Sequence, residues 1–212
     1  KKLLTVALAA TMAIGSVFSA SAATISGAWW TAWTEGYEIA DGATVEFDID
    51  VKGGDLVWNN VAAVFVNSKT TGTQVPKDEV GADYKEYAVV RGDNWGWGGG
   101  DNKSLSGGDI TYEGGVADLG DADFIATMKD CHIDATITRS GNDITMVYNG
   151  TGANGMTFTR TAKFSEDMSA GSYVFFVSDN AEVTVTKVES GAPAEDTTTA
   201  AENESTTVPS SN

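Results

Sequence analysis

The sequence predicts an all-β fold, a single antiparallel β-sandwich of the jelly-roll kind. Eight short segments alternate apolar and polar residues, and Gly, Asn and Asp residues that favour turns separate them. Alternation with a period of two places the apolar side chains of a strand on one face. Only Asp121 to Lys129 favours a short helix, and strands do not alternate with helices, so a parallel α/β sheet is not expected.

The eight segments follow one another from residue 45 to residue 188. Residues 45 to 51 alternate apolar with acidic residues, which predicts a half-buried strand with one solvated face. The other seven are Leu56 to Val66, Tyr84 to Arg91, Cys131 to Arg139, Asp143 to Asn149, Met156 to Phe164, Ser172 to Ser178 and Ala181 to Val188. Both faces of the Leu56 to Val66 segment are mostly apolar. Ser140-Gly141-Asn142 predicts a tight hairpin turn between two of the segments.

The two ends of the chain differ from this core in composition. Lys1-Lys2, the apolar stretch Leu3 to Phe18, and Ala20-Ser21-Ala22 have the three parts of a secretory signal peptide, so residues 1–22 are expected to be cleaved. The apolar stretch is shorter than the roughly 20 residues of a membrane-spanning helix, so no membrane insertion is expected after cleavage. Residues 190–212 are rich in Thr, Ser, Ala and Glu, which predicts a disordered linker. Linkers of this kind normally connect to a further domain.

The sandwich domain is therefore expected over residues 23–189, secreted or on the cell surface. Without two lysines at the start and four acidic residues at the end, 11 basic and 26 acidic residues remain, a net charge of −15. Such a surface repels phosphate backbones, so nucleic acid is not an expected partner. Cys131 is the only cysteine, which excludes a disulfide framework. Its neighbour His132 points to the opposite face of a strand, which excludes a thiol–imidazole dyad.

No cofactor is expected, with a structural calcium ion left open as the alternative. The run Asp118-Leu119-Gly120-Asp121-Ala122-Asp123 offers oxygen ligands at spacings that calcium accepts. In a chain this acidic, composition alone produces such a pattern.

The stretch Arg91 to Gly98 is the most informative one for function. Nine of the 24 glycines lie between Gly92 and Gly115, and little side-chain mass surrounds Trp95 and Trp97. Large aromatic side chains in such a loop indicate a binding surface. Four more tryptophans precede them, Trp29, Trp30, Trp33 and Trp58.

These residues suit a polysaccharide ligand, because a tryptophan ring stacks on the C–H face of a pyranose with little loss of entropy. The predicted ligand-binding residues are Trp95, Trp97, Trp30, Trp33, Trp58, Asn94 and Asp93. Core roles stay open for Trp97, for Trp58, and for one of the adjacent pair Trp29 and Trp30, which point to opposite faces of a strand. Arg91 and Asp93 are spaced to brace the loop with a charge-assisted bond.

The order of these motifs resembles a known family. The motifs are Ala28-Trp29-Trp30-Thr31, Trp58-Asn59-Asn60, the run from Glu86 to Gly98, and the strand-turn-strand of residues 131–149. They resemble the non-catalytic carbohydrate-binding modules of secreted bacterial glycan-degrading proteins, most nearly the β-sandwich modules of family 65, which bind β-glucans. Tyr87, Val89, Arg91, Asp93, Gly96, Trp97 and Gly98 carry the specific part of the likeness. The stretch Lys69 to Asp83 departs from it as an insertion. The resemblance implies tryptophan-mediated binding of a neutral polysaccharide.

Two other functions remain as alternatives. Glu46, Asp48 and Asp50 resemble the Glu-x-Asp-x-Glu strand of concanavalin-like glycoside hydrolases, with Glu46 and Asp50 as the catalytic pair. Asp50 stands where that family has Glu, and a solvated strand face explains the pattern more simply, so we expect no enzyme activity. The export signal and the acidic linker equally fit a cell-surface adhesion or structural module.

Overall fold

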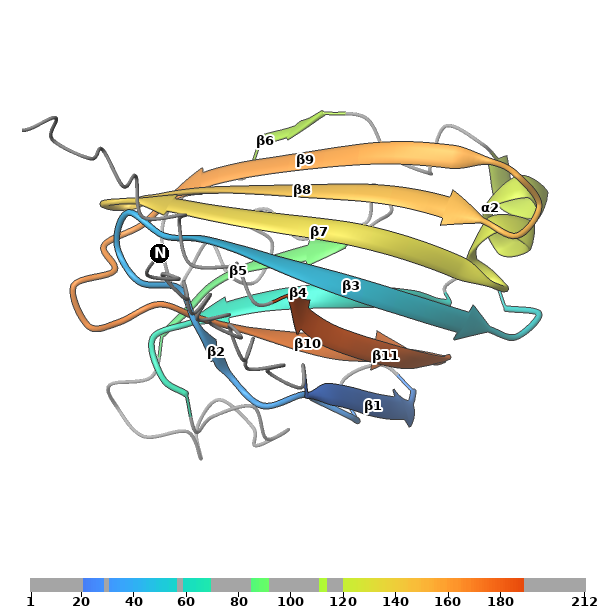
Figure 1. The fold of residues 1–212 in the computed structure, drawn as a ribbon, viewed down its shortest axis with the longest axis horizontal. Coiled ribbons are helices and arrows are strands. Elements are labelled where there is room, and N and C mark those ends of the chain that lie inside the picture. Colours follow the sequence, from blue (N-terminus) through green and yellow to red (C-terminus); the bar gives the residue numbers. More distant parts are fainter. Residues whose placement is uncertain are drawn as a thin grey trace, which may run out of the picture.

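The computed structural model of the chain describes residues 21–28, 31–56, 59–69, 85–91, 111–113 and 120–188. Two antiparallel sheets pack against each other within this part of the chain, and one short helix lies at an end of the sandwich (Figure 1). The predicted all-β sandwich is therefore confirmed. None of the described helices is long and apolar enough to span a membrane.

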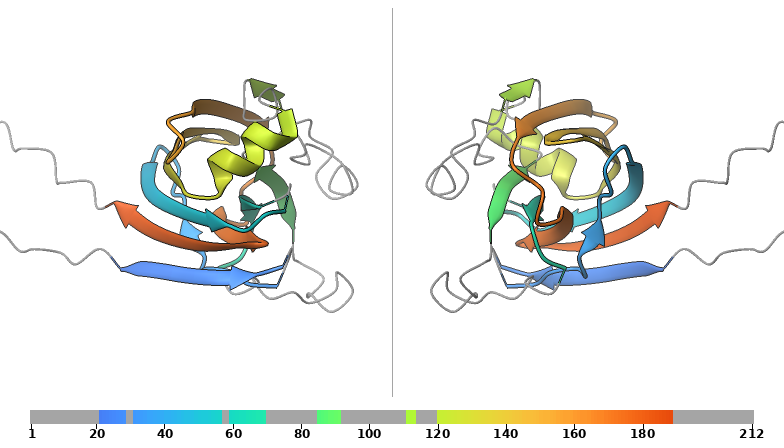
Figure 2. Two further views of the ribbon diagram at one scale, coloured as in Figure 1. Left: turned by 90° about the vertical axis from the view of Figure 1, so that its right-hand side faces the viewer. Right: turned by 90° about the vertical axis from the view of Figure 1, so that its left-hand side faces the viewer.

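The larger sheet has the strand order β1-β11-β3-β7-β8-β9-β6. Its strands are β1 (Ala22–Gly27), β3 (Thr44–Gly53), β6 (Thr111–Glu113), β7 (Cys131–Ser140), β8 (Asp143–Gly152), β9 (Thr157–Ser165) and β11 (Ala181–Val188). The end-on views in Figure 2 show this sheet curving around the core, from β1 on one side to β9 on the other. The β7–β8 hairpin is confirmed, because Ser140 pairs with Asp143 across a turn that opens with Gly141 at φ 62°.

The smaller sheet has the strand order β2-β10-β4-β5. Its strands are β2 (Tyr37–Glu38), β4 (Asn60–Val66), β5 (Glu86–Arg91) and β10 (Tyr173–Asp179). Helix α2 (Gly120–Met128), predicted over residues 121–129, lies beside the ends of β8 and β9. Phe124 and Met128 of this helix belong to the core between the sheets.

The core forms because the alternating strands turn their apolar faces toward each other. Phe47 of β3 contacts Phe176 of β10 with ring centroids 4.9 Å apart, and Phe65 of β4 contacts Phe164 of β9 at 5.1 Å. Both pairs join one sheet to the other in edge-on geometry, which aromatic rings favour. Inward side chains of β3, β7, β8 and β11 complete the same cluster.

One predicted strand begins later than expected. Leu56 lies in a bend and is 47% exposed, whereas β4 starts only at Asn60. The buried Asn59 side chain explains the difference, because its Nδ2 donates to the carbonyl oxygens of Gly54 (2.8 Å) and Leu56 (2.6 Å). These bonds hold a turn where the apolar pattern predicted extended chain.

Strands β1, β2 and β6 were not predicted. All three lie at sheet edges, and β2 and β6 have only two and three residues. Strand β1 includes Ala22, the last residue of the predicted signal peptide, which pairs with Thr186 of β11.

Candidate functional site

The smaller sheet buries side chains on both of its faces. Every residue of β4 and β5 is buried. The outer face, which points away from the larger sheet, carries a second apolar cluster of Ala62, Val64, Val66, Val89, Phe175 and Val177. Trp33 and Tyr173 pack against this cluster and are themselves only partly buried. The expectation that both faces of the β4 segment are apolar is therefore confirmed.

Trp33 is the one predicted ligand-binding residue within the described part of the chain. It forms an isolated antiparallel bridge with Val177, and its ring lies 5.8 Å from that of Phe175 at an interplanar angle of 77°. The next residue, Thr34, fixes this segment to β10. Its backbone N–H donates to the Phe176 carbonyl, and its hydroxyl oxygen accepts from the Phe176 N–H, both at 3.0 Å. Trp33 thus holds a defined place on the outer face, with part of its surface accessible.

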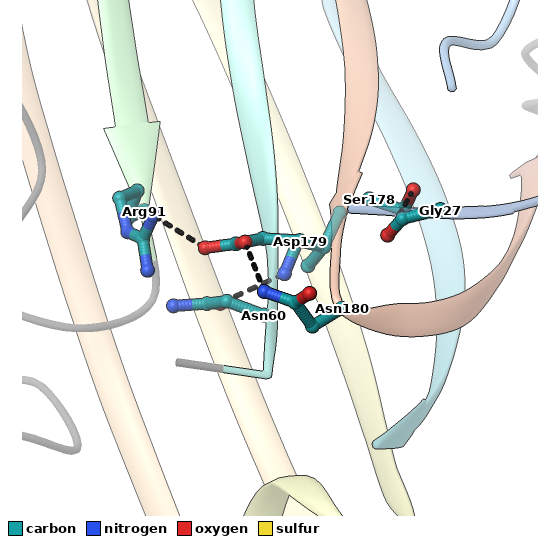
Figure 3. Close-up of polar contacts among 7 residues, drawn as sticks. Gly27, Asn60, Arg91, Ser178, Asp179 and Asn180 are labelled. Atoms are coloured by element: carbon teal, nitrogen blue, oxygen red, sulfur yellow. Dashed lines mark hydrogen bonds and ion pairs between the residues drawn. The ribbon is translucent and has the colours of Figure 1, made fainter. Parts of the chain in front are cut away.

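Arg91 and Asp179 form a buried ion pair (Figure 3), two residues along their strands from Val89 and Val177 of the apolar cluster. The Arg91 guanidinium at the end of β5 donates to the Asp179 carboxylate at the end of β10, with a nitrogen–oxygen distance of 2.8 Å. Asn180 Nδ2 donates to the other carboxylate oxygen of Asp179 at 2.9 Å. The two charged side chains are only 9% and 5% exposed. Burial of this kind makes the pair depend on its hydrogen bonds, because either charge alone would be costly to keep out of water.

Arg91 therefore has a structural partner 88 residues away. The expected brace between Arg91 and Asp93 is not tested, because Asp93 lies outside the described residues. The structural interpretation of Arg91 agrees with its burial against Asp179.

The ion pair also lies where three tryptophan-bearing segments join the described structure. Residues 29–30 follow Gly27 and Ala28, and the Gly27 carbonyl accepts from the Asn180 N–H at 2.9 Å. Residues 57–58 precede Asn59 and Asn60, and Asn60 pairs in register with Asp179. Residues 92–110 follow Arg91 itself. At least one flank of each segment thus lies at this end of the smaller sheet.

The remaining predicted ligand-binding residues lie outside the described residues. These are Trp30, Trp58, Asp93, Asn94, Trp95 and Trp97, together with Trp29. For the calcium alternative, Asp118 is also outside, and Asp123 is exposed on helix α2.

The outer face of the larger sheet carries a second group of polar side chains. Glu46, Asp48 and Asp50 are exposed there on β3, as the alternation predicted. Strand β7 places His132 opposite Asp50, and Asp134 opposite Asp48. His132 Nδ1 lies 2.8 Å from an Asp50 oxygen, and its Nε2 lies 3.4 Å from an Asp134 oxygen. The sequence did not single out this cluster, because its members come from two strands more than 80 residues apart.

The neighbouring carboxylates raise the pKa of His132, chiefly through the hydrogen bond with Asp50 and against a smaller opposing effect of burial. Cys131 points into the core on the other face, and burial raises the pKa of its thiol to about 12. The predicted separation of Cys131 from His132 is thereby confirmed.

A pH dependence of stability follows from His132. Its pKa is above the usual 6.5 in the folded state, so protonation favours folding. This contribution is fully present below the unfolded-state pKa and is lost as pH rises through the folded-state pKa. We therefore expect His132→Gln to be less stable than the wild type at about pH 5.5 and equally stable at about pH 9. Urea unfolding at both pH values measures this, and an equal difference at the two would contradict it.

Comparison with protein-family models, with curated proteins and with solved structures finds no match to this chain.

Proposed function

We propose that the chain is a non-catalytic binding domain for a neutral polysaccharide, with a β-glucan-like polymer favoured. The binding site comprises Trp33 on the outer face of the smaller sheet and the tryptophan-bearing segments that join this end of it. The observation that carries the proposal is that one flank of each segment, at Gly27, Asn60 and Arg91, lies around the Arg91–Asp179 pair. A chain extends at most about 3.3–3.6 Å per residue from such an anchor, which supports including Trp30 and Trp58 in the proposed site.

The chemistry of the site favours an uncharged sugar polymer. Trp33 rests on Phe175 and so needs little further ordering when a ligand stacks on it. Trp33 packs against the apolar cluster, and an indole ring offers the flat, weakly polar surface that matches a pyranose face. The acidic surface of the chain repels polymers of uronic acids, which also supports a neutral ligand.

The arrangement of carboxylates supports binding without hydrolysis. Asp50, which is one methylene shorter, stands where the concanavalin-like hydrolases have Glu, and its carboxylate lies 2.8 Å from His132 Nδ1. A retaining glycosidase needs both carboxyl groups directed at the same glycosidic bond. The rival proposal predicts reducing-sugar release from β-glucans that disappears in Glu46→Gln.

Binding is tested by screening the full chain on a glycan array and then by affinity electrophoresis in the best polymer. We expect retardation by a neutral glucan that barely changes between low and high salt, because stacking on an uncharged sugar exchanges no ions. A matched polyuronate is the control and should not retard the chain. Retardation by the polyuronate alone, or by no polymer, would contradict the proposal.

A further inference from the structure

We propose a binding site for a divalent transition metal ion, with Zn²⁺ as the best match, on the outer face of the larger sheet. The ligands are His132 Nε2 and one carboxylate oxygen each from Asp48 and Asp134. Asp50 orients the imidazole through its hydrogen bond with His132 Nδ1. This site is on the larger sheet, whereas Trp33 lies on the outer face of the smaller sheet, and the metal site does not depend on the proposed glycan binding.

The geometry of the three ligands fits one metal ion. One ligand atom from each of Asp48, His132 and Asp134 lies within 4.8 Å of the others. Zn²⁺ binds imidazole nitrogen and carboxylate oxygen at about 2.0–2.2 Å, so ligand atoms on one ion lie within about 4.4 Å of each other, and small rotations of these exposed side chains bring the three atoms to that spacing. The three residues stand on the adjacent, hydrogen-bonded strands β3 and β7, which hold their backbones at a fixed spacing.

The charges of the cluster favour a bound cation. Asp48 and Asp134 are directly opposite in the β3–β7 register, and like charges in such a pair are destabilising. Asp48 with Asp134, and Asp50 with His132, form two cross-strand rows, and the next residues in each row on the flanking strands are neutral. Thr184 and Thr186 are their neighbours on β11, and Asn149 and Thr151 on β8. Along β3 the adjacent charged residues on this face are Glu46 and Lys52. His132 is thus the one positive group within these two described rows, and only when it is protonated.

The hydrogen bond of His132 prepares it as a ligand. A neutral imidazole that donates from Nδ1 to Asp50 at 2.8 Å has its lone pair on Nε2, the nitrogen that faces Asp134. Carboxylates in this second position fix the tautomer and strengthen the ligand in many metal sites. A metal ion must displace the proton that the raised pKa retains on the ring, so affinity should increase with pH.

The donor set selects the class of metal. One imidazole nitrogen with two carboxylate oxygens suits Zn²⁺ and its first-row neighbours, whereas Ca²⁺ and Mg²⁺ prefer oxygen ligands alone. All three side chains are exposed, so water completes the coordination and we expect modest affinity. The buried Cys131 thiol belongs to the core and does not compete.

The test is a titration of the full chain, carrying no histidine tag, with ZnCl₂ followed by ¹H NMR. His132 is the only histidine in the sequence, so its ring signals report on the site without assignment ambiguity. We expect the signals to shift and saturate at one equivalent, with tighter binding at higher pH. His132→Gln and Asp134→Asn should each lose most of the affinity, measured by calorimetry, and Asp50→Asn should weaken it about 10–100-fold.

Glu182→Gln is the matched control, because Glu182 is an exposed carboxylate on the same face, opposite Lys52. It should bind Zn²⁺ like the wild type. An unshifted imidazole, equal weakening in the Glu182 variant, or equally tight binding of Mg²⁺ would overturn the proposal, since each indicates at most general attraction of cations to an acidic surface.

Discussion

Arg91→Met should destabilise the protein by about 3–5 kcal/mol, the usual cost of removing one partner from a buried ion pair. The substitution removes the guanidinium from a carboxylate that is only 5% exposed, and the neutral hydrogen bond from Asn180 does not supply the lost positive charge. Urea unfolding followed by circular dichroism gives the free energy of unfolding.

The double variant Arg91→Met/Asp179→Leu separates the cost of an unpaired charge from the value of the pair. Two apolar side chains on this face would extend the cluster around Val89 and Val177, so most of the lost stability should return. A single variant as stable as the wild type, or a double variant worse than both single variants, would contradict the structural role of the pair.

Trp95→Ala and Trp97→Ala should each weaken glycan binding by about 1–3 kcal/mol, the cost measured for other stacking aromatics. A platform residue exchanges its contacts with solvent for contacts with sugar, so its removal should leave the melting temperature nearly unchanged. A core residue would instead lower the melting temperature and leave binding in proportion to the folded fraction.

Phe176→Ala is the comparison for that distinction, because Phe176 is fully buried between Phe47 and Tyr37. It should lower the melting temperature while the folded fraction still binds. If Trp95→Ala and Trp97→Ala both stay folded and bind like the wild type, the loop after Arg91 is not the binding site.

Alternation allowed most of the larger sheet to be predicted from the sequence. Strands β3, β7, β8 and β11 expose one face to water, so their patterns are unambiguous and their predicted bounds lie close to those observed. The predicted start of β4 was wrong. The Asn59 side chain holds the preceding chain by hydrogen bonds to the Gly54 and Leu56 carbonyls, and an apolar pattern does not indicate such bonds. The edge strands β1, β2 and β6 depend on pairing with distant partners such as Thr186 and Val174, and local sequence does not encode that pairing.

The polar clusters could not be predicted from the sequence, because they too depend on pairing between distant strands. Arg91 meets Asp179, and Asp50 meets His132, only through the order of the strands in each sheet. The alternation predicts both the acidic face of β3 and the strand β7, but not that β7 lies beside β3. A search for a lone histidine on an exposed strand face would have drawn attention to His132.

We propose that a neutral glycan binds at the end of the smaller sheet where Arg91 meets Asp179. Titration of the ¹⁵N-labelled chain with a glucan oligosaccharide tests it most directly, because each of the six tryptophans contributes one indole N–H signal and His132 contributes a reporter on the other sheet. We expect the indole signals of Trp95, Trp97 and Trp30 or Trp33 to shift with one common affinity, while the His132 signals stay in place. Shifts at His132 without shifts at the indoles, or no shift with any glycan selected by the array, would contradict the claim.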